Sequence, residues 1–298
     1  ASGVATRRWG RADDPGADDG LDLPGEGETF VVKTEDGAEL AGVVCGDPVG
    51  PTVVLSHCWM GSRSVWAPVA RRLCAAGHRV VLYDQRGHGA STTGADVLTV
   101  SLLGSDLRAV LDELDIEDAV VAGHSMGGMA AMAFAIDHPD ALKRRVRAIV
   151  LVATAAHGIG YHRRLHPFNE WLAASPVWEQ AVRRPRIGLV FVRSASGRTP
   201  RLAHVAAMRD HVLATTAASR QACLRALQRM DLREGLDSVD VPATVLVGSR
   251  DALTPPALSR ALAARLTNSR IEVIPDAGHL LPFESPDRLT EVIAQSFE

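Results

Sequence analysis

Short apolar runs alternate with helical patterns along most of this chain of 298 residues, and this alternation limits the folds open to it. In these runs polar and apolar residues do not alternate, which is typical of parallel strands buried on both faces. The runs cover residues 52–55, 80–83, 119–122, 148–152, 244–247 and 271–274. Helical patterns separate them at residues 65–75, 98–114, 128–137, 256–266 and 286–296. Together with an opening hairpin at residues 30–33 and 39–45, this order predicts an α/β fold, a mostly parallel sheet of eight strands with helices on both faces.

One serine follows the predicted strand 119–122, in the sequence Gly123-His124-Ser125-Met126-Gly127. A G-x-S-x-G motif between a strand and a helix is typical of a nucleophile elbow, a sharp turn that holds the serine hydroxyl clear of the backbone. Glycines two residues to either side leave room for the strained backbone of such a turn. We therefore predict that Ser125 is a nucleophile.

Two further residues have the positions that a catalytic serine needs. Asp251 follows the predicted strand 244–247, and His279 follows the predicted strand 271–274. Open parallel sheets carry their reactive groups just past the C-terminal ends of the strands. A serine hydroxyl is too weak an acid to attack unaided, so His279 is expected to take its proton and Asp251 to orient and stabilise the imidazole. The sequence therefore predicts a catalytic triad of Ser125, Asp251 and His279.

With these motifs the chain resembles the α/β-hydrolase superfamily, and in particular its lid-containing serine hydrolases of the esterase and lipase type. The resemblance extends from about residue 29 to the end, and it rests on Leu55-Ser56-His57, the segment 84–91, the serine elbow, and Gly248 to Asp251 with Gly278-His279. It implies the α/β-hydrolase fold with an inserted helical lid. It does not select the reaction, because this fold hosts esterases, lipases, thioesterases, amidases, carbon-carbon hydrolases, dehalogenases and epoxide hydrolases.

The resemblance also implies an oxyanion hole, the pair of N–H groups that binds the developing negative charge. His57-Cys58-Trp59 stands where the family usually has His-Gly-X, so the backbone N–H groups of Trp59 and Met126 are the expected donors. Cys58 places a side chain where the family mostly has none. We interpret it as a buried filler rather than a second nucleophile, because free cysteines are usually buried and inert.

The segment 84–91 contains aspartate, arginine and histidine, which could be mistaken for a second catalytic cluster. Its glycines indicate a tight turn after a strand, and in the family this loop is structural. Asp106, Asp112 and Asp115 are spaced along one helical pattern, which predicts a solvated helix face.

Residues 155–235 are too long for a loop and rich in helical patterning, so they predict the lid, between core segments 29–154 and 236–298. Residues 154–235 hold 13 basic and 5 acidic side chains, a net charge of +8, in a chain of net charge −3. This charge favours an anionic or lipid-like substrate, although the arginines could simply solvate the helices. The lid aromatics, including Phe191, could line an acyl pocket or pack the lid on the core. The candidate substrate-binding residues are His57, Cys58, His124, Tyr161, Phe168, Trp171, Trp178 and Leu280.

Residues 1–28 combine three arginines and seven acidic residues with Gly and Pro, which predicts a flexible acidic tail. Arginines also collect beside the cytoplasmic end of a membrane span, so an anchor upstream of Ala1 is the alternative. Four irregularly spaced cysteines indicate free thiols in a reducing compartment and no zinc site. We expect a cytoplasmic protein with no nucleic-acid partner, no metal and no cofactor, or a membrane-associated one if an anchor preceded the arginines.

The expected function is hydrolysis of a carboxylic ester or thioester with a hydrophobic acyl part, through an acyl-enzyme on Ser125. A serine at the elbow argues against the dehalogenase and epoxide hydrolase patterns, which use an aspartate. Leu280 stands after His279, where carbon-carbon hydrolases of ring cleavage often have an aromatic residue. Carbon-carbon hydrolysis, acyl transfer or cyclisation on the same triad, and a non-catalytic small-molecule receptor remain alternatives.

Overall fold

The protein is described by a computed structural model, which covers residues 20–25, 27–157 and 166–298. Eight strands form one sheet in the order β1-β2-β4-β3-β5-β6-β7-β8, which confirms the predicted architecture. The antiparallel pairs are β1 with β2 and β2 with β4, and the remaining pairs are parallel. The strands are β1 (Gly27–Lys33), β2 (Glu39–Gly46), β3 (Thr52–Ser56), β4 (Arg79–Tyr83), β5 (Ala119–His124), β6 (Val146–Val152), β7 (Ala243–Gly248) and β8 (Ser269–Ile274).

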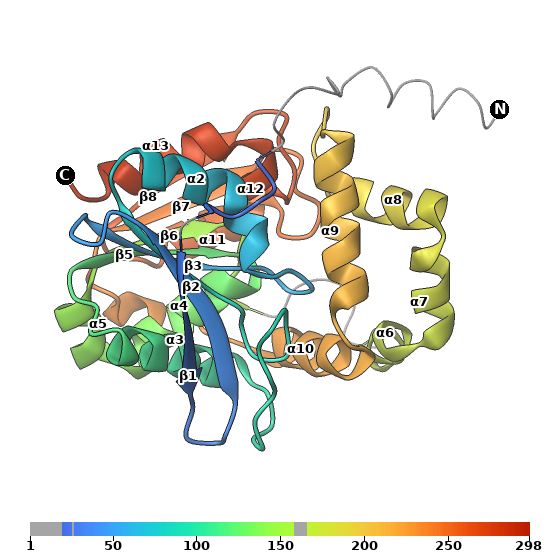
Figure 1. Cartoon of the computed structure of the whole chain (residues 1–298), viewed down its shortest axis with the longest axis horizontal. Coiled ribbons are helices and arrows are strands. Elements are labelled where there is room, and N and C mark those ends of the chain that lie inside the picture. Colours follow the sequence, from blue (N-terminus) through green and yellow to red (C-terminus); the bar gives the residue numbers. More distant parts are fainter. Residues whose placement is uncertain (1–19, 26, 158–165) are drawn as a thin grey trace.

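Helices cover both faces of this sheet (Figure 1). One layer contains α2 (Ala67–Ala75), α12 (Leu281–Glu284) and α13 (Pro286–Gln295), and the other contains α3 (Val100–Glu113), α4 (Met126–Asp137), α5 (Pro139–Arg145) and α11 (Pro256–Ala263). Successive residues of a strand point to opposite faces, so Val53 and Leu55 of β3 pack under α2 while Val54 packs on the α3 and α4 side. Burial on both sides explains why the central residues of β3 are all apolar.

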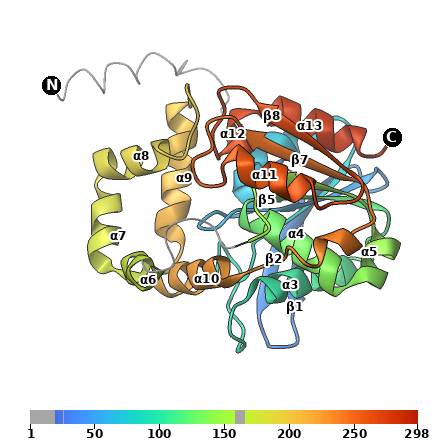
Figure 2. The ribbon, with the colours of Figure 1, turned by 180° about the vertical axis from the view of Figure 1, so that it is seen from behind.

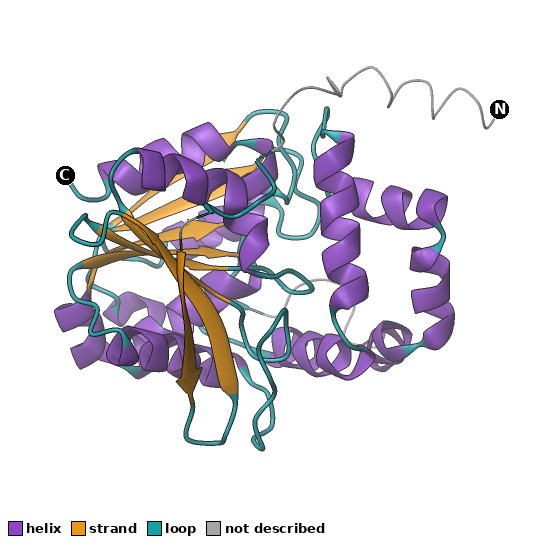
Figure 3. Ribbon diagram, viewed as in Figure 1, coloured by secondary structure: helices purple, strands orange, loops and turns teal. Residues whose placement is uncertain are grey.

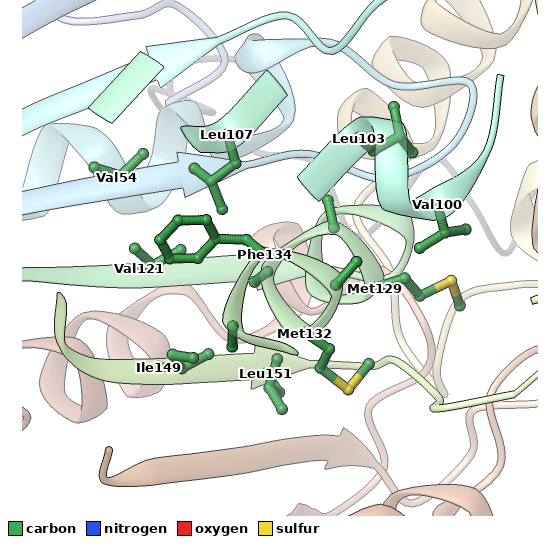
Figure 4. Close-up of a cluster of buried hydrophobic side chains, with 14 of the residues drawn as sticks. Val54, Val100, Leu103, Leu107, Val121, Met129, Met132, Phe134, Ile149 and Leu151 are labelled. Carbon is green, nitrogen blue, oxygen red and sulfur yellow. The ribbon is translucent and has the colours of Figure 1, made fainter. Parts of the chain in front are cut away.

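The larger core lies between the sheet and helices α3 and α4 (Figure 4). Phe134 of α4 lies there between Val121 of β5 and Leu107 of α3, and all three side chains are buried. Since α4 is buried along almost its whole length, it is a rigid support for the turn at its N-terminus. That turn carries Ser125.

The helical insertion runs between β6 and β7 and comprises α6 (His166–Ala174), α7 (Pro176–Arg183), α8 (Pro185–Arg193), α9 (Leu202–Ala214) and α10 (Ala217–Arg229). It lies beyond the C-terminal ends of the parallel strands, with α9 and α10 next to the core and α6 to α8 farther out (Figures 2 and 3). Val205, Met208 and Val212 of α9 share one buried cluster with Met60 and Leu280 of the core loops. An apolar contact therefore joins the insertion to the loops at the ends of β3 and β8.

One expectation differs from the structure. Asp106 does not lie on a solvated face but is 1% exposed, because both its oxygens accept bonds of 2.6 Å from the buried guanidinium of Arg86. The same guanidinium binds Asp36 at 2.8 Å. At the described end of the predicted acidic tail, Leu21 and Leu23 pack on buried clusters, and β1 begins at Gly27.

Candidate active site

Ser125 lies in a strained turn between β5 and α4. Its φ of 54° and ψ of −113° are unusual for a residue with a side chain, and such strain is typical of functional positions. The turn is held by the Ser125 N–H, which donates to Val152 O at 2.9 Å, and by the Ser125 carbonyl, which accepts from Thr154 Oγ1 at 2.8 Å. The strand, the turn and the helix thus have the arrangement that the motif predicts.

Close packing of the backbone explains the glycines of this motif. A Cβ on Gly123 would lie 2.4 Å from Gly127 O, and one on Gly127 would lie 2.2 Å from Ser56 O. These distances are too short for any side chain, because the atoms in the way are backbone atoms. The elbow therefore packs directly against the end of β3.

Asp251 and His279 form a buried pair at the ends of β7 and β8. His279 Nδ1 lies 2.8 Å from Asp251 Oδ2. Since a carboxylate only accepts, Nδ1 carries the proton and leaves Nε2 as a free acceptor. Burial opposes ionisation of Asp251, but its bonds to His279 and Thr254 outweigh this and hold the pKa of the carboxyl below its ordinary value. The imidazole is thus oriented by an ionised carboxylate, as a general base requires.

Thr254 is a supporting residue that the motifs did not reveal. Its hydroxyl donates to Asp251 Oδ2 at 2.8 Å, and its N–H donates to Oδ1 at 2.9 Å. The Leu253 N–H adds a second donor to Oδ1 at 2.9 Å. The short turn after β7 therefore fixes the carboxylate with its own backbone, a signal that the Asp-x-x-Thr spacing could have given.

His124 joins the serine elbow to the His279 loop. Its Nε2 lies 2.8 Å from the His279 carbonyl oxygen, so Nε2 donates, and the two rings lie 5.1 Å apart between centroids. Burial lowers the pKa of His124 to about 3, which keeps the ring neutral. Between Ser125 and His279 themselves the structure has no hydrogen bond, and such catalytic bonds often form only with substrate present.

The two expected oxyanion donors are the N–H groups of Trp59, in the loop after β3, and of Met126, directly after Ser125. Among the described residues, no acceptor binds the N–H of Trp59 or of Met126. His57 is fully buried beneath the loop, where Nδ1 donates to Cys58 O at 2.8 Å and Nε2 accepts from the Gln85 N–H at 2.9 Å. Burial lowers the pKa of His57 to about 4, which keeps the imidazole neutral. A neutral ring can donate at one nitrogen and accept at the other, as these two hydrogen bonds require.

Cys58 is buried within the cluster that joins this loop to the insertion. Burial raises the pKa of its thiol to about 12, which keeps it protonated near neutral pH. All four cysteines have free thiols. The surroundings of Cys58 therefore favour the filler interpretation over a nucleophilic one.

The candidate residues of the insertion occupy different places. Phe168 and Trp171 pair on α6 with their ring centroids 5.8 Å apart, and more than half of each side chain is exposed. Trp178 packs against Phe191 and beneath the guanidinium of Arg220, 4.9 Å from its ring centroid. Leu280 is buried directly after His279, and Tyr161 lies outside the described residues.

The segment 84–91 is a structural brace. His88 accepts the Met60 N–H at Nε2 over 3.1 Å, and Asp84 binds Arg63 at 2.7 Å. In the described part of the chain, no group of three His, Cys, Asp or Glu side chains could hold a metal ion. Of the helices in that part, none has the length and hydrophobicity that a membrane span requires.

The chain is similar to known proteins over most of its length. The profile described as "Alpha/beta hydrolase family" matches residues 53–292. The chain belongs to the alpha/beta hydrolase family. Within it, RutD of Caulobacter sp. (strain K31), whose name proposes carbamate hydrolysis, is 30% identical over 244 residues, 81% of this chain and 88% of the relative.

Two other members of the alpha/beta hydrolase family are named for different reactions. The 2-hydroxy-6-oxononadienedioate/2-hydroxy-6-oxononatrienedioate hydrolase of Cupriavidus pinatubonensis is 30% identical over 273 residues, 87% of this chain and 91% of the relative. The crystal structure of the enol-lactonase from Burkholderia xenovorans LB400 is similar with a TM-score of 0.77 and 28% identity, over 90% of this chain and 99% of that one. The family membership is thus clear, while these relatives are named for different reactions.

Proposed function

We propose that this protein is a serine hydrolase that cleaves a carboxylic ester or thioester through an acyl-enzyme on Ser125. The observation that carries the proposal is the pairing of His279 Nδ1 with Asp251 at 2.8 Å, on a loop bonded to the residue before Ser125. This arrangement leaves the other imidazole nitrogen free to act as a base. A strained serine turn supplies the nucleophile.

The reaction follows from the roles of these groups. Ser125 Oγ attacks the carbonyl carbon while His279 Nε2 takes the hydroxyl proton, and the oxyanion binds the N–H groups of Trp59 and Met126. The tetrahedral intermediate then collapses, and His279 gives the proton to the departing alkoxide or thiolate. A water molecule, deprotonated by His279, attacks the acyl-enzyme, and Ser125 leaves as the free hydroxyl. Asp251 stabilises the imidazolium that forms in each half of the cycle.

A hydrophobic acyl part suits the surroundings of this site. Cys58, Met60 and Leu280 from the core loops pack with Val205 and Met208 of α9 in one apolar cluster. Trp59 borders the same cluster and is only partly buried. An acyl chain leaving the oxyanion loop toward α9 would meet these apolar side chains.

Carbon-carbon hydrolysis is the second candidate. It is supported by the Cupriavidus relative, which is named as the hydrolase of a dienedioate, at 30% identity over 87% of this chain. The excess of arginine in the insertion would favour a carboxylate-bearing substrate of that kind. Leu280 next to His279 favours ester cleavage instead, and acyl transfer or a receptor role would use the same pocket.

The test compares wild type with Ser125→Ala on chromogenic esters of increasing acyl length, matched thioesters, lactones, carbamates and a vinylogous 1,5-diketone acid. Ser101→Ala, an exposed serine on α3, is the control. We expect wild type and control to release a burst of chromophore equal to the enzyme concentration, with medium acyl chains turned over fastest, and Ser125→Ala to give neither. Faster turnover of the diketone acid would select carbon-carbon hydrolysis. Ligand binding without any burst, unchanged in Ser125→Ala, would identify a receptor.

A further inference from the structure

Glu284 is an acidic residue beside His279 that the reaction outlined above does not use. It ends α12, five residues after the histidine, and its carboxylate accepts three backbone N–H groups. Gly278 donates to Oε2 at 2.9 Å and Leu280 donates to Oε1 at 3.0 Å, so the residues on both sides of His279 are bound through their N–H groups. Gly197 donates to Oε2 at 2.6 Å.

The third donor comes from the insertion. Gly197 lies between α8 and α9, in a segment that runs alongside the His279 loop. The His279 N–H donates to Ala195 O at 2.8 Å, and the Arg198 N–H donates to Asp276 O at 2.8 Å. One carboxylate oxygen therefore bridges the insertion and the loop that carries the imidazole.

The two segments touch so closely that neither has room for a side chain at the contact. A Cβ on Gly278 would lie 2.4 Å from Gly197 N, and one on Gly197 would lie 2.2 Å from Asp276 O. The opposite edge of the His279 peptide is held by His124, which donates to the His279 carbonyl. The main chain of His279 is thus bonded to the elbow on one side and to the insertion on the other.

A carboxylate in this place is not explained by charge pairing. Among the described residues, no ion pair reaches Glu284. Burial raises the pKa of Glu284, whereas its three N–H donors and the nearby charge of His279 act in the opposite sense. Since a partly buried carboxylate without an ion-pair partner is costly, its geometric effect on the loop is the better explanation.

We propose that Glu284 is a positioning residue for His279. It holds the imidazole between Ser125 and Asp251, and it makes the position of the imidazole depend on the insertion. The proposal rests on the base role proposed for His279. Misplacement of a catalytic group by about 1 Å costs about 10²-fold in rate. Loss of all three bonds is therefore expected to reduce turnover strongly while binding of the substrate changes little.

The experiment uses Glu284→Ala, Glu284→Gln and the control Glu291→Gln, whose carboxylate pairs with Arg288 on the exposed face of α13. In Glu284→Gln one oxygen still accepts, but the amide NH₂ replaces an acceptor, so at least one bond is lost. At a temperature where all variants are folded, we expect kcat to fall about 10²-fold in Glu284→Ala and less in Glu284→Gln, with KM changed less than threefold. The control keeps wild-type values.

Hydrogen exchange supplies a readout that does not depend on activity. We expect faster amide exchange in Glu284→Ala both at 276–280 and at 195–198, and no change in the control. Wild-type kcat in the folded Glu284 variants, or exchange altered in the His279 loop alone, would overturn the proposal. If Glu284→Ala does not fold, the isosteric Glu284→Gln decides by the same two measurements. If wild type itself shows no burst, the proposed function fails, and exchange at both segments still decides whether Glu284 couples them.

Discussion

Replacing Asp251 by Asn tests the imidazole orientation on which the reaction depends. Four donors converge on this carboxylate: His279 Nδ1 and Thr254 Oγ1 at Oδ2, and the N–H groups of Leu253 and Thr254 at Oδ1. An asparagine offers one oxygen and one NH₂ group. If its NH₂ faced the backbone, the N–H groups of Leu253 and Thr254 would lose their acceptor, and each unpaired donor would cost about 1–3 kcal/mol in stability. We therefore expect the NH₂ to face His279.

In that arrangement the imidazole must accept at Nδ1, and its proton moves to Nε2. A protonated Nε2 cannot take the proton of Ser125, so kcat should fall about 10⁴-fold, which corresponds to about 5 kcal/mol of transition-state stabilisation. The assay is steady-state turnover of the best ester at pH 7.5, with circular dichroism and thermal melting to confirm the fold. Asp237→Asn, an exposed residue of a short 3-10 helix, is the matched control. A kcat of Asp251→Asn within tenfold of wild type would refute the assigned orientation.

Three further changes test other parts of the structure. Gly127→Ala places a Cβ 2.2 Å from Ser56 O, so we expect a loss of about 1–3 kcal/mol in unfolding free energy and no ester burst; an unchanged melting temperature would contradict the elbow packing. Asp106→Ala leaves the buried Arg86 with Asp36 as its remaining carboxylate and should cost about 3 kcal/mol in urea unfolding, with Ser125 still reactive at low temperature. Cys58→Ala should keep kcat within tenfold of wild type. Iodoacetamide should not inactivate wild type between pH 7 and 9, because burial holds the pKa of this thiol at about 12. Rapid inactivation of wild type that is absent in Cys58→Ala would show a reactive thiolate.

The fold could be predicted from the sequence because local signals agree with the global arrangement. Strands such as β5 and β7 are buried at every position and mostly apolar, which happens only when both faces are covered. The elbow needs glycines at fixed offsets, and Asp251 and His279 each follow a strand, so their convergence at one edge of the sheet follows from the parallel topology. The Asp251 to His279 hydrogen bond agrees with that reasoning.

What the sequence could not provide depends on partners distant along the chain. Asp106 was expected to be solvated. Its buried partner, Arg86, lies 20 residues earlier in the chain, and nothing in the helix sequence indicates this pair. His124 bonds the carbonyl of His279 and Glu284 bonds the N–H groups of its two neighbours, and hydrogen bonds to backbone groups leave no pattern of complementary side chains. The sequence pattern of the insertion does not predict which of its aromatic residues are exposed, as Phe168 is, and which are packed, as Trp178 is.

Covalent titration with a fluorophosphonate tests most directly whether Ser125 is an activated nucleophile. We expect one phosphonyl group per chain, mapped by peptide mass spectrometry to Ser125, with labelling abolished in Ser125→Ala and slowed about 10⁴-fold in Asp251→Asn. Equal labelling in Ser125→Ala, or none in folded wild type that binds ligands, would contradict the proposal that this chain is a serine hydrolase.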